Sequence, residues 1–158
     1  IISAIQSAKR VQIIAVGNTI PVALDGAFKF NEIGIPTVAG SIWETQASYS
    51  LNLTKKDVLI AISNSGESSK IYTIVDLANK RKVTTIGITN NKNSAIGKIV
   101  KYHLQTATRE KLFLDEFYFS RISASTIIEI LYLFLTLEQK DCYKRLSQCE
   151  EIFADEKL

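Results

Sequence analysis

One stretch decides the fold: Asp57-Val58-Leu59-Ile60-Ala61-Ile62, followed by Ser63-Asn64-Ser65-Gly66-Glu67-Ser68. Its first half is a nearly continuous apolar run, which predicts a strand over 57–63 that is buried on both faces. Its second half is a polar loop, and residues 68–82 after it carry apolar side chains at helical spacing. A strand buried on both faces is typical of a parallel sheet that has helices on each side.

The alternation of strand and helix repeats on both sides of this stretch. Short apolar or β-branched runs predict further strands at 11–16, 35–39, 83–88 and 102–104. Helical patterns cover 21–33, with Gly34 as its C-cap, and 42–53. A chain of 158 residues suits one compact domain over 1–158. The sequence therefore predicts a single α/β domain with three α/β/α layers, doubly wound around a mainly parallel five-stranded sheet.

Residues 120–139 form a predicted helix that is apolar on two sides. The apolar side chains are Ile127, Ile128, Leu131 and Phe134 on one side, and Ile130, Leu133 and Leu137 on the other. A helix with two apolar sides is buried twice, which predicts a subunit interface in a dimer or tetramer. A helix sandwiched inside one chain is the alternative. The apolar run is too short to span a bilayer, so we expect no membrane partner.

Charge and cysteine content limit the cellular context. The net charge is +3, and the Lys80-Arg81-Lys82 cluster is typical of a solvated helix end, so we expect no DNA-binding stripe in this chain. Cys142 and Cys149 lie about 10 Å apart on one predicted helix, too far for a disulfide. Free thiols indicate a reducing compartment, the cytoplasm. The first residues resemble the interior of a helix rather than a signal peptide, so we expect a fragment of a longer protein.

The polar loop lies beyond the carboxyl end of its strand, where doubly wound folds bind ligands. Ser63, Asn64, Ser65 and Ser68 offer hydroxyl and amide groups, and Gly66 permits a tight turn. The free N–H groups and the dipole of the following helix point into the same space. These features predict a site for a phosphate dianion held by neutral donors. A serine-rich helix cap with nothing bound is the alternative.

A second polar loop favours the ligand site over the empty cap. Gly17-Asn18-Thr19 ends the strand over 11–16 and precedes Pro21, a favoured first-turn residue. In a doubly wound sheet, both loops can face one pocket. Other phosphate motifs are absent, because the sequence has no Gly-Lys-Ser/Thr and no Gly-x-Gly-x-x-Gly after its first strand. The two cysteines have no His and no second Cys pair near them in the sequence, so a zinc site is not expected. We expect a small phosphorylated ligand and neither a cofactor nor a metal.

The loop resembles the Ser-x-Ser-Gly-Glu-Thr/Ser signature of SIS domains, the sugar isomerase fold, which is flavodoxin-like. The strand over 57–62 is similar to that family's strand, and Gly17-Asn18-Thr19 resembles its first loop. The resemblance covers nearly the whole chain. It implies a phosphosugar-binding site, with the residues Ser63, Asn64, Ser65, Ser68 and Thr19 on the phosphate and Gly17, Asn18, Gly66 and Glu67 beside them.

Within this family the sequence is most similar to RpiR-type transcriptional regulators. Residues 28–35 look like their Lys-Phe/Leu-x-x-Ile-Gly stretch, and 120–132 is similar to a Ser-Arg-Ile helix of theirs, with Glu129 where Asp is usual. The resemblance implies an effector-binding domain that senses a sugar phosphate, acts through a homo-oligomer and controls carbohydrate-metabolism genes. It also implies that DNA is bound by an N-terminal helix-turn-helix domain, which this sequence does not include.

An enzyme is the alternative to a sensor. SIS enzymes move a proton next to a carbonyl, which requires a general base. Glu44 is the best candidate, although a solvated Glu at a helix start is the favoured interpretation. We interpret His103 as structural and Glu67 as a loop organiser. Without a clear acid/base pair, the sequence favours a sensor over an isomerase or lyase that uses Glu44. An oligomerisation domain with an unused loop is a third alternative.

Overall fold

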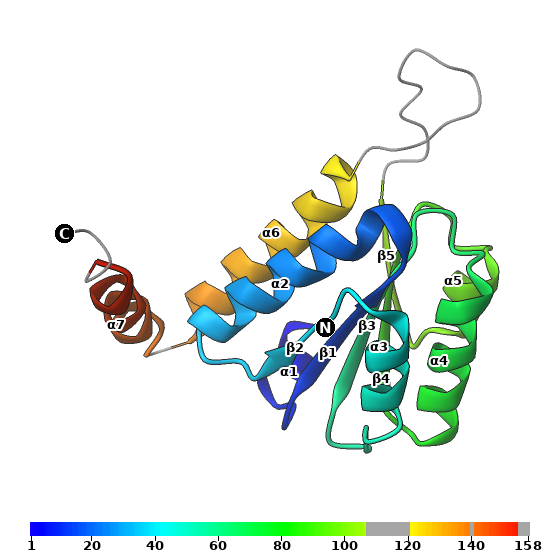
Figure 1. Ribbon diagram of the computed structural model, residues 1–158, viewed down its shortest axis with the longest axis horizontal. Helices are drawn as coiled ribbons and strands as arrows, with labels where there is room; N and C mark the ends of the chain where they lie inside the picture. Colours follow the sequence, from blue (N-terminus) through cyan, green and yellow to red (C-terminus); the bar gives the residue numbers. More distant parts are fainter. Residues whose placement is uncertain (107–120, 140, 155–158) are drawn as a thin grey trace, which may run out of the picture.

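The computed structural model describes residues 1–106, 121–139 and 141–154 and contains one parallel sheet (Figure 1). Its strands are β1 (Val11–Ala15), β2 (Thr37–Val38), β3 (Val58–Ile62), β4 (Thr84–Thr89) and β5 (Tyr102–Gln105). They pair in parallel in the order β2-β1-β3-β4-β5. This doubly wound order confirms the predicted fold class. It also makes β1 and β3, whose loops carry the predicted site, direct neighbours.

Helices cover both faces of the sheet. One layer contains α1 (Ile2–Gln6), α2 (Ile20–Glu32) and α6 (Ile122–Glu138), and α7 (Cys142–Ala154) follows beyond the end of α6 (Figure 1), with Cys142 packed into the same core. The other contains α3 (Trp43–Ser50), α4 (Ser69–Lys80) and α5 (Ala95–Ile99). Figure 1 shows α2 and α6 side by side on one side of the sheet and α4 and α5 on the other.

The central strand β3 shows why the apolar run needs two helical layers. Val58, Ile60 and Ile62 pack into the core beneath α2 and α6, whereas Leu59 and Ala61 pack into the core beneath α4. All five side chains of β3 are buried. Burial of about 25 cal/mol per Å² of apolar surface on both faces stabilises this strand more than any edge strand. Its carboxyl end is therefore a rigid base for the loop that follows.

The predicted elements are present, with ends shifted by one to three residues. Gly34 follows α2 with φ +83°, the left-handed conformation expected of a residue just after a helix. Cys142 and Cys149 both lie on α7 as free thiols, as predicted. The helix α5 was not predicted, because a helix of five residues is too short to show a helical period.

The prediction for α6 is only partly correct. Its buried residues are Ala124, Ile128, Leu131 and Leu135. Phe134, which we grouped with Ile128 and Leu131, is 52% exposed because it lies about 100° around the helix from that stripe. Ser120, the predicted start of this helix, lies outside the described residues. In the described residues no single helix is long and apolar enough to cross a membrane. The pair α6 and α7, which is bent by 115°, has the combined length and apolar composition of a membrane span.

Candidate functional site

Two polar loops meet at the carboxyl edge of β1 and β3, at the upper end of the sheet in Figure 1. Ala15 pairs with Ile62, so the residues that follow each strand begin side by side. Gly17–Thr19 forms a single 3-10 turn, η1, before α2. Thr19 joins the loops, because its hydroxyl donates to Val16 O at 3.0 Å and lies 3.4 Å from Ile62 O. The structure thus brings the two predicted loops together.

Gly66 fixes the shape of the second loop. Its φ is +72°, and its N–H donates to Ser63 O at 3.1 Å, which closes a tight turn. A Cβ at this position would lie 2.0 Å from Ser94 Oγ, so no other residue fits without movement of the neighbouring loop. The glycine therefore provides both the left-handed turn and the close approach of the loop after β4.

The serines of the loop differ in how many of their polar groups already form hydrogen bonds within the protein. Ser63 is buried, and its N–H donates to Ile88 O at 3.0 Å. Ser68 is the N-cap of α4, and its Oγ accepts from the Ile71 N–H at 3.5 Å. Ser65 is exposed, and its Oγ accepts from the Glu67 N–H at 3.2 Å, so its O–H remains available to a ligand.

The start of α4 adds backbone donors and a positive potential. The first intrahelical bond runs from the Tyr72 N–H to Ser68 O at 2.9 Å, so the N–H groups of Ser69 and Lys70 precede the helical ladder. The dipole of the 12-residue helix contributes about half a positive charge at this end. The Lys70 ammonium lies 5.6 Å from the Trp43 ring centre, which brings a cation of α4 beside α3. A dianionic oxygen cluster suits these donors.

The loop between β4 and α5 forms a further side of the candidate site, and the sequence did not predict it. The Asn90 N–H donates to Asn64 O at 2.8 Å, and the Ile96 N–H donates to Gly66 O at 2.9 Å. Ser94 is buried against Gly66, and its Oγ donates to Asn91 O at 2.6 Å. The signal was present, because polar residues follow β4 at its carboxyl end, as they follow β1 and β3.

Glu67 connects the loop around Gly66 to the loop between β4 and α5. Its Oε1 accepts from the Ala95 N–H at 3.2 Å, at the start of α5, so the carboxylate joins the two loops. A shallow depression of about 450 Å³ between α4 and α5 reaches Glu67 and Ser69 from the outer flank of the loop.

The candidate bases lie apart from the loop contacts. Glu44 is exposed on the first turn of α3 and forms no hydrogen bond or ion pair with another described residue. His103 is on β5, where its Nε2 lies 2.8 Å from Thr89 Oγ1. Burial and then the Lys92 charge lower the pKa of His103 below its ordinary 6.5. A neutral imidazole bonded to a threonine agrees with a structural role.

Gln46 is a second residue that the sequence analysis missed. Beyond Gln12 the short strand β2 no longer pairs with β1, and the Gln46 side chain takes its place. Its Oε1 accepts from the Ala15 N–H and its Nε2 donates to Ala15 O, both at 3.0 Å. Gln12 Nε2 in turn donates to Gln46 O at 2.8 Å. This buried network holds the end of β1, and hence the Gly17–Thr19 loop, against α3.

Metal chemistry has no support in the residues that the structure describes. Within residues 1–106, 121–139 and 141–154, no three side chains of His, Cys, Asp or Glu gather as metal ligands would. The donors at the carboxyl edge are hydroxyl groups, amides and backbone N–H groups, which suit an anion rather than a cation.

Comparison with known proteins gives the family. The SIS domain family matches residues 4–134. An uncharacterized HTH-type transcriptional regulator of Caldanaerobacter subterraneus subsp. tengcongensis is 28% identical over 156 residues, which cover 98% of this chain and 55% of that protein. The chain thus spans about half the length of this relative.

Solved structures share the fold. The NanR protein of Vibrio vulnificus, complexed with ManNAc-6P, superposes with a TM-score of 0.85 at 19% identity, covering 96% of this chain and 57% of that one. The sugar isomerase domain of an RpiR transcription factor from Sphaerobacter thermophilus gives a TM-score of 0.82 at 19% identity, covering 95% and 83%. With the family match over residues 4–134, the strand order and the loop after β3 agree that this chain belongs to the SIS domain family.

Proposed function

We propose that this chain is the effector-binding domain of a cytoplasmic transcriptional regulator, and that it senses a phosphorylated sugar and controls carbohydrate-metabolism genes. The observation that carries this proposal is the turn at Gly66, which presents the Ser65 hydroxyl and the first N–H groups of α4 at one place. Such neutral donors at a helix start recognise a phosphate group. The likeness to an HTH-type regulator, to NanR and to an RpiR factor supports a regulatory role.

The phosphate group is expected at Ser65 and Ser68 and at the backbone around Gly66. Ser63, Asn64 and Glu67 shape the loop from within, and Glu67 also holds the loop after β4. Gly17, Asn18 and Thr19 would contact the sugar or the phosphate from the neighbouring loop. Gly17 has φ +59° and open space around its Cα, so a ligand can approach its backbone closely.

A homo-oligomer, with a dimer as its smallest form, is part of the same proposal. The exposed side of α6 carries five large apolar side chains, Ile122, Ile130, Leu133, Phe134 and Leu137. Contiguous exposed apolar surface of this kind marks protein–protein contacts. In a regulator, such an interface would transmit ligand binding to the DNA-binding part of the protein.

The test is a thermal-shift screen against sugar phosphates, ManNAc-6P included, with the unphosphorylated sugars as controls. A ligand at 100 times its dissociation constant adds about 2.7 kcal/mol of stability. Because Ser65 is exposed, the fold should accommodate Ser65→Leu, which removes the hydroxyl and fills the expected phosphate position. We expect this variant to fold and to lose the shift, and Ser48→Leu, on the exposed side of α3, to retain it. A shift that survives in Ser65→Leu would contradict the proposal.

The enzyme alternative has its own outcome. A sugar-phosphate isomerase or lyase that uses Glu44 as base would show turnover that Glu44→Gln abolishes. A sensor would show a thermal shift with the phosphosugar and no turnover, and Glu44→Gln would leave that shift in place. Because Glu44 is exposed and forms no hydrogen bond or ion pair with a described residue that would orient it as a base, we favour the sensor.

A further inference from the structure

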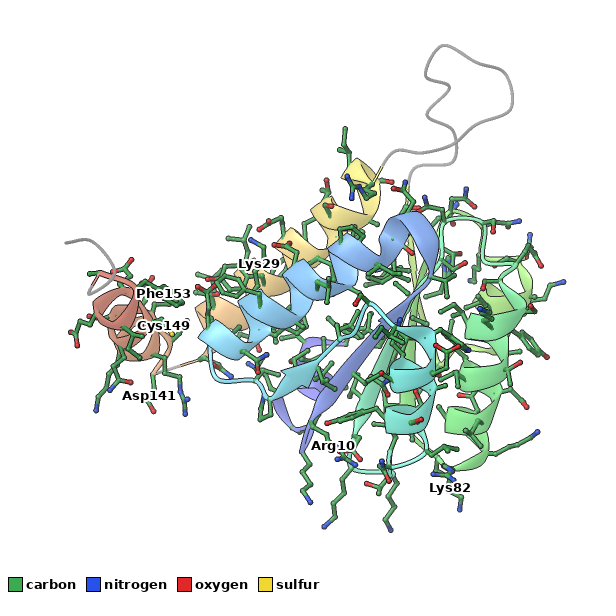
Figure 2. All side chains as sticks on the ribbon, in the orientation of Figure 1. Arg10, Lys29, Lys82, Asp141, Cys149 and Phe153 are labelled. Atoms are coloured by element: carbon green, nitrogen blue, oxygen red, sulfur yellow. The ribbon has the colours of Figure 1, made fainter. Side chains whose placement is uncertain are left out.

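The fold gathers cationic side chains at the amino ends of three adjacent strands, at the opposite end of the sheet from the candidate site. These seven residues, here called the basic edge, are Lys9, Arg10, Lys55, Lys56, Lys80, Arg81 and Lys82. Their segments precede β1, β3 and β4, which are neighbours in the sheet. The Lys9 N–H donates to Lys56 O at 2.8 Å, and Figure 2 shows Arg10 and Lys82 at the same lower end of the molecule.

The charge at this edge is only partly neutralised. Its segments, residues 7–10, 51–57 and 76–83, contain two carboxylates, Asp57 and Asp76, which pair with Arg10 at 3.3 Å and with Lys80 at 2.7 Å. Among the described residues, the exposed ammonium groups of Lys9, Lys55, Lys56 and Lys82 have no ion-pair partner. Seven cations and two carboxylates leave five positive charges here, more than the net +3 of the whole chain.

The backbone of Lys82 has a conformation in which glycine is the usual residue. Among the described residues, Lys82 is the non-glycine residue with a positive φ, +60°, in the turn between α4 and β4. Its N–H donates to Asn79 O at 2.9 Å, so the turn requires this conformation. Glycine adopts it without strain, whereas lysine does not. A strained residue of this kind is typical of a position where function offsets stability.

We propose that the basic edge binds the phosphate backbone of double-stranded DNA, without sequence preference. This inference rests on the regulatory function proposed above, in which DNA is held by another part of the protein. Most residues of the basic edge are lysines, whose charges lie at the ends of flexible side chains. Such side chains suit a partner with closely spaced negative charges, such as the DNA backbone. The row spans two strand spacings, about 10 Å, and DNA carries one charge per about 1.7 Å of its axis.

Such a contact is weak alone and effective when DNA is already nearby. Sequence-independent contacts give dissociation constants of about 10⁻⁴ to 10⁻⁶ M at physiological salt. Linkage to a DNA-bound module raises the effective concentration to the millimolar range, which is enough to saturate this surface. The basic edge would then orient the sensor domain on the duplex.

The test is fluorescence anisotropy of this chain with a labelled duplex of unrelated sequence, between about 50 and 200 mM salt. If the four exposed lysines each neutralise one phosphate, the logarithm of the affinity falls with the logarithm of salt with a slope of about −3.6. Lys55→Gln with Lys56→Gln should lower the affinity at least about tenfold at the lower salt and make the slope shallower by about 2.

The matched control removes the same charge at the other end of the sheet. Lys70→Gln with Lys92→Gln should change the affinity by less than about twofold, because neither residue faces the basic edge. Equal losses in the two double variants would overturn the inference, since net charge alone would explain them. So would binding to phosphatidylserine vesicles but not to DNA, because the partner would then be a membrane surface.

Lys82→Gly separates the charge from the fold. It should raise Tm by about 2–4 °C through relief of the left-handed lysine, and make the salt slope shallower by about 1. DNA affinity equal to that of the natural chain would contradict the role of Lys82. The sugar-phosphate thermal shift is expected to persist in Lys82→Gly and in the Lys55→Gln, Lys56→Gln double variant, because all three residues lie at the opposite end of the sheet from the candidate site. In the natural chain, absence of DNA binding with an intact sugar-phosphate shift would contradict this inference alone, whereas DNA binding without that shift would contradict the proposed function alone.

Discussion

At the scale of single residues, the candidate site divides into side chains that build it and groups that remain for a ligand. Thr19, Ser68 and Glu67 use their oxygen atoms to hold loops and helix ends together. The Ser65 Oγ accepts one hydrogen bond and keeps its O–H as a donor, and the first N–H groups of α4 precede the helical ladder. Ser65 can therefore be changed with little effect on stability, whereas Ser68 both caps α4 and is expected to contact the phosphate.

Gly66 is the position in the loop at which we expect substitution to cost the most stability. Gly66→Ala combines a left-handed backbone with a Cβ 2.0 Å from Ser94 Oγ. We expect a loss of at least about 2 kcal/mol in the free energy of unfolding, measured with urea. In Gly40→Ala the new Cβ would meet Gln46 Cγ at an ordinary 3.5 Å, and we expect a loss below about 0.5 kcal/mol. Equal losses would show that the turn is not constrained as described.

His103 gives the chain a pH dependence of stability. Burial and Lys92 lower its pKa in the folded state below the ordinary 6.5. The unfolded chain then binds protons more readily, so stability falls as the pH drops through 6.5. We expect the natural chain to lose Tm between about pH 7 and pH 5, and His103→Asn, which does not titrate, to lose less over the same interval. Identical pH profiles would contradict this assignment.

The sequence predicted the residues of the loop itself but not the distant residues that pack against the two loops. The serines, Gly66 and the preceding strand are contiguous, so their chemistry was evident from the sequence. Ser94 is distant in sequence from the loop around Gly66, and Gln46 is distant from the Gly17–Thr19 loop, and only the parallel register brings each of them close to its loop. A single sequence carries no signal for such distant pairs.

At the scale of elements, the end of β1 depends on a side chain of α3. The two-residue strand β2 pairs with Val11 and Gln12 only, and the Gln46 amide then pairs with both polar atoms of Ala15. Gln12, Gln46 and Ser50 are all buried and joined by hydrogen bonds. The network is satisfied, so it fixes a single position for the first loop.

Gln46→Leu tests this arrangement. The substitution keeps the volume but leaves the N–H and C=O of Ala15 without partners in a buried place. Each such group costs about 1–3 kcal/mol, so we expect a loss of about 2–5 kcal/mol in urea unfolding. Thr45→Leu, the exposed neighbour on α3, should stay within about 0.5 kcal/mol of the natural chain. A neutral Gln46→Leu would show that β1 does not need α3.

Element prediction succeeded where periodicity was strong and failed where tertiary contacts decide. The continuous apolar run of β3 and the helical spacing of α4 identified both elements. By contrast, α5 depends on the Ser94 cap and on packing against α4 and β4. The exposed Phe134 shows that an apolar helix does not reveal which of its sides its own sheet covers.

At the scale of the whole molecule, three surfaces have different chemistry. The carboxyl end of the sheet offers neutral donors, the amino end carries the basic edge, and α6 exposes apolar side chains between them. The basic edge was not evident from the sequence, because its charges come from three segments that the parallel register aligns. Ligand, DNA and partner-subunit contacts are thus proposed for separate surfaces.

The exposed side of α6 is expected to hold the oligomer together. Leu133→Lys with Phe134→Lys should convert the oligomer to monomers by light scattering, because each side chain is more than half exposed in the single chain, at 58% and 52%. Thr45→Lys with Ser48→Lys adds the same charge on the opposite helical layer and should leave the mass unchanged. A mass unaffected by the α6 substitutions would place the interface elsewhere.

The central claim is that the loop after β3 holds the phosphate of a sugar phosphate. A crystal structure of the chain with the sugar phosphate that gives the largest thermal shift tests it most directly. We expect the phosphate oxygens within about 3 Å of Ser65 Oγ and of the first N–H groups of α4. A phosphate bound elsewhere, or a loop occupied by its own side chains at saturating ligand, would contradict it.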